Sequence, residues 1–315
     1  MDFNNPGGFV ILHPGLFRQA IPKIKCYNQN MNDQRPYPLI VGFIADLMFA
    51  VKVEDVARRL NFQVEMIERA DQIAPLDPDT PPRQLAEHIV GPGAVLLDKL
   101  TLWQPALIIF DLGNPEVPWR DWVALIKSVP ATRRIPVICF GSHVDVETMK
   151  AAKSAGADSV LARSRFVSDL PALIQKYARQ PDYPALEASC HLPISKLALK
   201  GLEEFNRGEY FEAHEYLEEA WNEDETVGRE LYRAILQVAV AYLQIERGNY
   251  NGAIKMFLRV RQWIDPLPDQ CRGINVAKLR DEAKKVHAML ISLGRERMSE
   301  FDRNLLRPVQ YRWEP

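Results

Sequence analysis

Ala106-Leu-Ile-Ile-Phe-Asp111 is a run of five apolar residues that ends in an aspartate. A continuous apolar run of this length is typical of a strand that is buried on both faces of a sheet. Four further strand-like runs occur in the same half of the chain, at Leu39–Ile44, Phe62–Ile67, Ile135–Phe140 and Ser159–Ala162. Segments with helical periodicity lie between or after them, at about Val53–Leu60, Ala94–Leu102, Trp119–Val129, Val146–Ala155 and Ser168–Ala178. The alternation predicts a five-stranded parallel sheet covered by helices on both faces.

Composition shifts along the chain predict where its parts begin and end. Residues 1–37 are rich in Asn, Gln, Pro and Gly and predict a poorly ordered leader, with Met31 as a second candidate translation start. The α/β part is expected at residues 38–179, and a proline-rich excursion loop within it at residues 71–88. A linker is expected at 180–192, an all-helical part at 193–304 and a tail at 305–315.

Charge, hydropathy and cysteine usage exclude several classes of protein. The 315 residues carry a formal net charge of −2, which predicts no nucleic-acid partner. The longest apolar stretches, Leu39–Val51 and Ile235–Ile245, are too short to cross a bilayer, so we expect no membrane partner. The four cysteines are scattered without a CxxC pair, and no secretory signal is evident, which predicts a cytoplasmic protein with reduced thiols.

The C-terminal half shows helical periodicity throughout. Helices are expected near Ser195–Arg207, Tyr210–Asn222, Val227–Arg247, Tyr250–Trp263 and Val276–Arg303. An internal repeat relates Arg207-Gly-Glu-Tyr-Phe-Glu-Ala213 to Arg247-Gly-Asn-Tyr-Asn-Gly-Ala253. The repeat resembles tetratricopeptide hairpins, and two copies predict a compact helical bundle rather than a long solenoid.

The N-terminal half resembles a response-regulator receiver domain. The resemblance rests on Leu107-Ile-Ile-Phe-Asp111, on Ile135-Pro-Val-Ile-Cys-Phe-Gly-Ser142 and on Gly156-Ala-Asp-Ser-Val-Leu-Ala-Arg163. It implies a flavodoxin-like, doubly wound sheet and a phosphoacceptor at Asp111, as in phosphorelay signal transduction.

Three positions depart from the receiver pattern. Only Asp46 remains of the acids that help to hold Mg²⁺, Ser142 falls one residue after the expected hydroxyl position, and Arg163 replaces the expected lysine. We therefore expect a degenerate receiver-like domain that serves docking or dimerisation, with an unidentified protein or a second copy of the chain as partner. A working phosphoacceptor at Asp111 is the alternative.

One helix of the C-terminal half carries an unusual polar pair. At 100° per residue, His214 and Glu218 fall on the flank of the apolar stripe, while Glu212, Glu215 and Glu219 point to the opposite side. Polar groups turned toward the inside of a bundle need a hydrogen bond, an ion pair or a cation. Spacing of i, i+4 also lets a helix offer two metal ligands on one side.

The stretch Glu212-Ala-His-Glu-Tyr-Leu-Glu-Glu-Ala-Trp221 contains HxxxExxW and resembles domain-of-unknown-function family 309 over about residues 195–290. The resemblance implies an all-helical fold and a motif suggested to bind metal, but no reaction. We therefore predict a divalent metal ion at His214 and Glu218. Candidates for further ligands or supporting contacts are Glu215, Glu230, Gln237 and Trp221.

Other interpretations of this motif are open. His214 and Glu218 are alternatively a structural pair, and Trp221 a core aromatic residue at helical spacing. The string His214-Glu215-x-x-Glu218 also resembles HExxH zinc peptidases, but the second histidine is absent.

Three functions follow as hypotheses. The first is a regulatory protein in which a degenerate receiver-like domain positions a metal- or ligand-binding helical domain. The second is an interaction module without metal. The third is a metal-dependent hydrolase.

Overall fold

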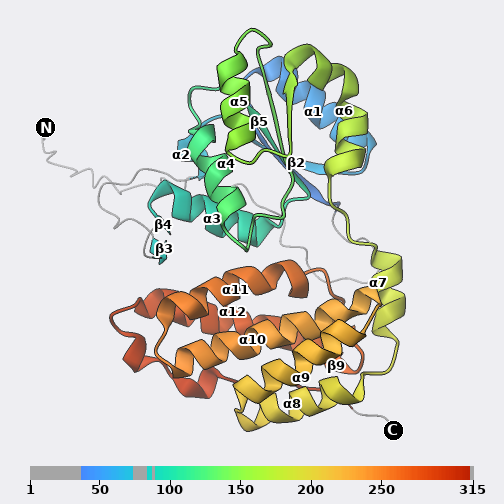
Figure 1. Cartoon of the computed structure of the whole chain (residues 1–315), viewed down its shortest axis with the longest axis vertical. Helices are drawn as coiled ribbons and strands as arrows, with labels where there is room; N and C mark the ends of the chain where they lie inside the picture. The colour runs from blue at the N-terminus through green and yellow to red at the C-terminus, as the bar shows by residue number, and fades with distance from the viewer. Residues whose placement is uncertain (1–36, 74–83, 87–88, 313–315) are drawn as a thin grey trace, which may run out of the picture. The chain divides into compact units, whose positions relative to one another are not determined.

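The N-terminal half of the protein is built on a parallel sheet. The computed structural model describes residues 37–73, 84–86 and 89–312. Within this part of the chain, five parallel strands lie in the order β2–β1–β5–β6–β7 (Figure 1). Their bounds are Leu39–Phe43 (β1), Gln63–Ile67 (β2), Leu107–Asp111 (β5), Val137–Gly141 (β6) and Ser159–Ala162 (β7). Taken in chain order this is 2-1-3-4-5, the order of flavodoxin-like doubly wound folds, so the predicted fold is confirmed.

Helices cover both faces of this sheet. On one face, α1 (Leu47–Arg59) and α6 (Arg163–Tyr177) bury Ile40 and Phe140 in one apolar cluster. On the other face, α3 (Pro92–Trp103), α4 (Trp119–Ser128) and α5 (Val146–Ser154) enclose Val41 and Phe110 in a second cluster. Successive strand residues therefore point into two different cores, which explains why these strands are apolar without interruption.

Two helices begin earlier than the apolar pattern predicts. Helix α1 begins at Leu47 rather than Val53, because the Asp46 carboxylate caps it by accepting a hydrogen bond from Met48 N at 2.9 Å. Its first turn exposes Leu47 and Met48, so this turn carries no amphipathic signal. Helix α6 begins at Arg163, directly after β7, rather than at Ser168.

The expected excursion loop contains short elements. Helix α2 spans Ala70–Ile73, and β3 (Gln84–Ala86) pairs antiparallel with β4 (Ile89–Val90). The remainder of that loop, and the expected leader apart from Tyr37, lie outside the described residues.

The C-terminal half consists of helices that pack in chain order. Each of α8 to α12 contacts the next one, as expected for a bundle of hairpins (Figure 1). Their bounds are Lys196–Arg207 (α8), Tyr210–Glu223 (α9), Glu230–Glu246 (α10), Tyr250–Ile264 (α11) and Val276–Leu293 (α12), with a 3₁₀ turn at Val227–Arg229 before α10. None of the helices in the described part of the chain is long and apolar enough to cross a bilayer.

The internal repeat corresponds to two equivalent turns. Gly208 and Gly248 have φ of 88° and 67°, and each follows a helix that it terminates in the left-handed conformation. Two residues later, Tyr210 and Tyr250 begin the next helices with buried rings. The repeated Gly and Tyr therefore mark the same hairpin geometry twice.

Helix α12 is shorter than predicted. It ends at Leu293, where Gly294 has φ of 67°, and two 3₁₀ turns at Met298–Glu300 and Arg303–Leu305 follow in place of its last turns. The tail beyond them is held by Asn206, whose side chain donates to Val309 O at 3.0 Å and accepts from Val309 N at 2.7 Å.

The expected linker contains a helix, and the expectation of reduced thiols is wrong for Cys190 and Cys271, although Cys139 is a free thiol as expected. Helix α7 spans Tyr183–Cys190, and the carboxylate of Asp182 caps it by accepting from Ala185 N at 3.1 Å. Cys190 forms a disulfide with Cys271 in the short hairpin β8 (Gln270–Cys271) and β9 (Ile274–Asn275). The two cysteines are 81 residues apart, so no local spacing reveals the pair.

The turn of this hairpin carries a buried guanidinium. Arg272 and Gly273 have φ of 50° and 79°, the backbone of a two-residue turn with both central residues left-handed. Gly273 is required here, since a Cβ would lie 2.5 Å from Arg312 O in the tail strand.

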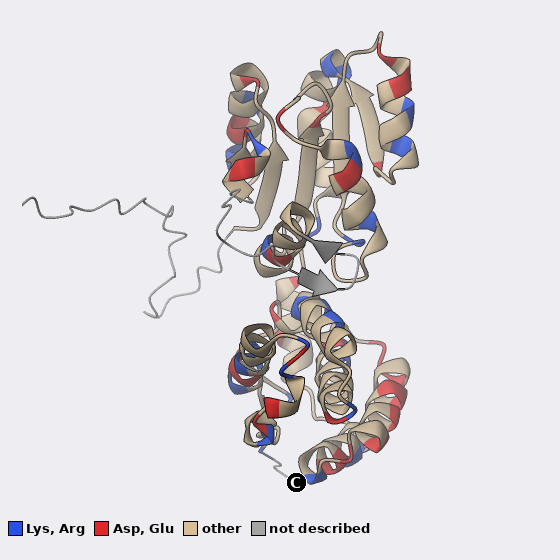
Figure 2. Cartoon of the chain, turned by 90° about the vertical axis from the view of Figure 1, so that its left-hand side faces the viewer, with Lys and Arg blue, Asp and Glu red and all other residues tan. Residues whose placement is uncertain are grey.

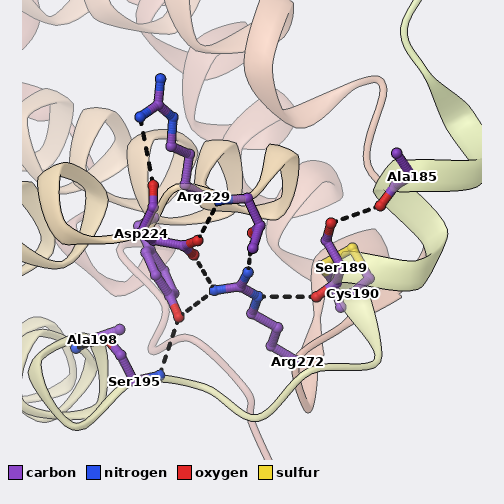
Figure 3. A network of polar contacts seen from close by, with 11 residues as sticks. Ala185, Ser189, Cys190, Ser195, Ala198, Asp224, Arg229 and Arg272 are labelled. Atoms are coloured by element: carbon purple, nitrogen blue, oxygen red, sulfur yellow. Dashed lines mark hydrogen bonds and ion pairs between the residues drawn. A yellow bond between two sulfur atoms is a disulfide. The ribbon is translucent and has the colours of Figure 1, made fainter.

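Arg272 is 7% exposed and joins four segments (Figure 3). Its Nε donates to Ser189 O at 3.2 Å and its Nη2 to Thr226 Oγ1 at 2.8 Å. Its Nη1 donates to Asp224 Oδ2 at 2.5 Å and to the Tyr232 hydroxyl at 2.6 Å. These bonds offset the backbone strain of a non-glycine residue in the left-handed region.

Candidate functional site

The HxxxExxW motif places a histidine between two carboxylates on α9. His214 Nδ1 lies 3.2 Å from Glu215 Oε1, and His214 Nε2 lies 3.8 Å from Glu218 Oε2. One ligand atom from each of the three residues lies within 4.8 Å of the others. The side chains are 27%, 60% and 52% exposed for His214, Glu215 and Glu218 respectively. The site therefore lies at the edge of the bundle and is open to solvent.

Two details of the helical-wheel prediction are corrected. Glu218 is more exposed than an inward-facing position implies, because the flank of α9 at this turn borders solvent rather than a neighbouring helix. Glu215 was expected to point away, but its long side chain folds back to the adjacent imidazole. The helical wheel gives the direction of each Cβ atom correctly but does not account for the length and flexibility of a glutamate side chain.

Glu230 does not join this group. Its Oε2 lies 3.5 Å from Arg233 Nη1, one turn along α10, and both side chains are largely buried. Gln237 lies on the same face of α10, is 3% exposed, and its Oε1 has no hydrogen-bond donor among the described residues. Of the predicted additional ligands, only Glu215 therefore lies beside His214 and Glu218 in the described structure.

Trp221 of the motif contacts Arg229, just before α10, and Arg233 of α10. The Arg233 guanidinium lies 4.6 Å from the Trp221 ring centroid and 3.8 Å from that of Trp263, so it is sandwiched between two indoles. Burial lowers the pKa of Arg233, although Glu230 opposes this effect. Cation–π contacts of this kind join α9, α10 and α11 and give the tryptophan of the motif a packing role.

The receiver-like half brings its own candidate residues to one edge of the sheet. Asp111 ends β5, Asp46 follows β1, Ser142 follows β6 and Arg163 follows β7. The carboxyl ends of parallel strands meet at this edge, where doubly wound folds bind their ligands.

Asp111 is 3% exposed and already has partners. Its Oδ1 accepts from Gly113 N at 2.9 Å and lies 3.6 Å from Arg163 Nη2. Burial raises the pKa of Asp111, and the nearby Asp46 adds to this, while Gly113 and Arg163 oppose it. A Cβ at Gly113 would push the Arg163 guanidinium away from its present position beside Asp111. Arg163 thus occupies the space beside the predicted phosphoacceptor.

Several solved structures are similar to this chain over just under half of its length. Similar chains include the Mn(2+)-bound form of response regulator Rcp1, at 18% identity over 44% of this chain and 90% of that chain, with a TM-score of 0.32. A putative response regulator from Chloroflexus aurantiacus J-10-fl is similar at 16% identity over 45% and 98%, with a TM-score of 0.35. The receiver domain of a histidine kinase from Syntrophus aciditrophicus is similar at 18% identity over 44% and 89%, with a TM-score of 0.34.

Part of the C-terminal half matches a family model. Residues 198–256 match the model of the family described as "Domain of unknown function (DUF309)", which confirms the resemblance found at HxxxExxW. A protein of Aquifex aeolicus (strain VF5) named "Uncharacterized protein" is 29% identical over 84 residues, which is 26% of this chain. The match spans only a quarter of the length of that relative.

The surface around the motif is strongly acidic. Helix α9 carries five glutamates and no Lys or Arg, and Figure 2 shows acidic residues gathered on helices of the C-terminal half. Glu212, Glu219 and Glu223 extend the negative charge of α9 beyond the motif itself. The acidic surface favours the approach of cations to His214.

Sequence reasoning missed the buried partners of this half. Arg233 and Trp263 lie on different helices, so the sequence gave no sign of their contact. Only the i, i+3 spacing of Glu230 and Arg233 on α10 indicated an ion pair. Arg272 gave no signal at all, because its partners Asp224 and Tyr232 are 48 and 40 residues away in the sequence.

Proposed function

We propose that this chain is a regulatory protein in which the helical half binds a divalent metal ion at His214 and Glu218. The observation that carries the proposal is the convergence of an imidazole and two carboxylates within 4.8 Å at the open edge of α9. His214 and Glu218 supply two donors of the kinds that bind Zn²⁺ or Mn²⁺, and Glu215 supports the imidazole.

The separation of the donor atoms fits a shared ion. Two tetrahedral bonds of about 2.0–2.2 Å place their donor atoms roughly 3.4 Å apart. His214 Nε2 and Glu218 Oε2 are 3.8 Å apart, so a small rotation of the glutamate side chain closes the difference.

Glu215 has a different role in this proposal. Its carboxylate lies beside Nδ1, the ring nitrogen that faces away from Glu218. A carboxylate on the second imidazole nitrogen fixes the tautomer and orientation of a ligating histidine and raises its basicity. Two protein ligands leave the other coordination positions to water or to a bound molecule, so the ion would mediate ligand binding.

The receiver-like half supports regulation without phosphotransfer. The Arg163 guanidinium beside Asp111 supplies the positive charge that a metal would otherwise bring, and Asp46 is held by the cap of α1. We infer that this half acts by docking to a protein partner or to a second copy of the chain. A cytoplasmic location is part of the proposal on the lack of an evident secretory signal, and the Cys190–Cys271 disulfide, which is uncommon in that compartment, counts against it.

An interaction module without metal is the second candidate. It is favoured by the contacts of His214 with Glu215 and Glu218, which satisfy the imidazole without an ion when it is protonated. In that case the acidic face of α9 would be the interaction surface.

Metal titration separates the two candidates. Chelator-treated protein is titrated with Zn²⁺ and with Mn²⁺ by calorimetry, in parallel with His214→Ala, Glu218→Gln and the control Glu219→Gln. Glu219 is an exposed neighbour on the same helix and lies outside the group. We expect one binding event in the unaltered chain and in the control, and its loss in the other two variants. Equal uptake in all four proteins would refute the metal site and favour the interaction module.

A further inference from the structure

A cavity at the opposite end of the sheet from Asp111 is lined mainly by cationic side chains. It has a volume of about 490 Å³ and lies where β6 and β7 begin and where α4 and α6 end. The charged residues that line it are Lys127, Arg133, Arg134, Asp158, Lys176 and Arg179. Five cations thus surround one space in a chain whose formal net charge is −2.

The single carboxylate of this cavity is already engaged. Asp158 Oδ2 lies 2.5 Å from Lys127 Nζ and accepts from Val137 N at 2.7 Å. Lys127 also donates to Ile135 O at 2.8 Å. The pair ties the end of α4 to the start of β6 and β7, and it leaves no acid for the other four cations of the cavity.

The architecture of the domain accounts for only part of this charge. Lys127 and Lys176 lie in the last turns of α4 and α6, where cations stabilise the carbonyl ends of helices. Arg133, Arg134 and Arg179 lie outside helices and form no ion pair with any carboxylate among the residues that the structure describes. All three are exposed, but the Arg134 guanidinium lies over the Trp263 ring, 4.8 Å from its centroid. The exposed guanidinium groups of Arg133 and Arg179 are therefore the ones best placed to meet a ligand.

The chemistry of these groups defines the ligand. Guanidinium forks bind phosphate oxygens through two parallel hydrogen bonds, and they do so more strongly than neutral donors. Several cations around one cavity match an anion with more than one phosphate group. A volume of this size is typical of sites for small molecules. Tyr177, which is half-buried, contributes an aromatic ring to the same cavity.

We propose that this cavity is a binding site for a small anion that carries two or more phosphate groups, held mainly by Arg133 and Arg179. The anion is either an inorganic polyphosphate chain or the polyphosphate chain of a nucleotide. The site is separate from the proposed metal site, and its occupancy does not depend on His214 or Glu218.

Titration with tripolyphosphate tests the proposal. The full chain is titrated by calorimetry in about 0.1 M salt, where exposed charges further apart than roughly 10 Å are screened. We expect saturable binding of one ligand per chain. The double variant Arg133→Ala/Arg179→Ala should bind at least about tenfold more weakly. The control Arg165→Ala removes an exposed arginine of α6 outside the cavity and should bind as the unaltered chain does.

Two further arms identify the source of the phosphates. If ATP binds more tightly than tripolyphosphate and Tyr177→Leu removes the difference, the ligand is a nucleotide. If both bind equally, the phosphate chain alone is recognised. Circular dichroism checks the fold of each variant, and the single variants Arg133→Gln and Arg179→Gln replace the double variant if it unfolds.

Three results would overturn the proposal. The first is the absence of saturable binding, and the second is an affinity of the arginine variants equal to that of Arg165→Ala. The third is tight binding of single-stranded RNA that tripolyphosphate does not displace, which would assign the surface to a nucleic acid.

Discussion

Replacing Arg272 with methionine removes four hydrogen bonds from the interior of the helical half while nearly preserving side-chain volume. The guanidinium is 4% exposed and the Asp224 carboxylate 12%, so neither charge is compensated by water. Removing one partner of such a buried pair costs about 3–5 kcal/mol, because the remaining charge is left unpaired. Domains are typically stable by about 5–15 kcal/mol, so the variant should unfold in markedly less urea.

The effect should depend on pH through Asp224. Burial alone would raise the pKa of this carboxyl, but hydrogen bonds from Arg272 and Thr226 outweigh burial and hold the pKa below its ordinary value of 3.8. The stabilisation is therefore fully present above that value and is lost as the pH falls through the folded-state pKa. The difference between the unaltered chain and Arg272→Met should shrink in strongly acidic buffer.

Urea unfolding at pH 7, followed by circular dichroism with the disulfide intact, measures the loss of stability. Asp224→Asn/Arg272→Met should recover part of it, because the double variant no longer buries an unpaired charge. Arg165→Met, which removes an arginine whose side chain is 74% exposed, serves as the control and should change little. A loss of unfolding free energy below about 1 kcal/mol in Arg272→Met would show that the hydrogen bonds of Arg272 contribute little to stability.

Reduction of the Cys190–Cys271 disulfide should lower the free energy of unfolding by about 2–5 kcal/mol, seen as a lower Tm with reductant, and Cys190→Ala should abolish this sensitivity. Burial raises the pKa of Asp111, so its charge is unfavourable in the fold above that pKa. Asp111→Asn should therefore raise Tm at pH 7 and give no gain in acid, where the native carboxyl is protonated. Treatment with acetyl phosphate should leave the intact mass of the protein unchanged. Incorporation of a phosphoryl group that Asp111→Asn abolishes would show that the receiver-like domain is phosphorylated after all. Trp221→Leu should lower Tm by removing one face of the Arg233 sandwich, whereas an unchanged Tm would argue against that contact.

The sequence predicted the architecture well, because both halves follow simple periodicities. Continuous apolar runs such as Leu107–Phe110 are buried on both sides, and Gly208 and Gly248 repeat one turn geometry. The predicted ends of helices were less accurate where a helix begins or ends at a capping side chain or a turn. The first turn of α1 depends on the side chain of Asp46 and shows no apolar stripe.

The sequence identified the candidate site residues but not how their side chains are arranged. The motif spacing correctly joined His214 to Glu218, since both lie on one helix. The wheel could not show that Glu215 folds back to the imidazole or that Glu230 is taken up by Arg233. Contacts between elements distant in the chain, above all the disulfide and the Arg272 network, require a tertiary fold to become visible.

The most direct test of the proposed metal site is crystallographic. Crystals of the full chain are soaked in Zn²⁺, and diffraction data are collected on both sides of the zinc absorption edge. We predict an anomalous peak within bonding distance of His214 Nε2 and Glu218 Oε2, with Glu215 on the opposite ring nitrogen. Clear density for these side chains without such a peak would contradict the account.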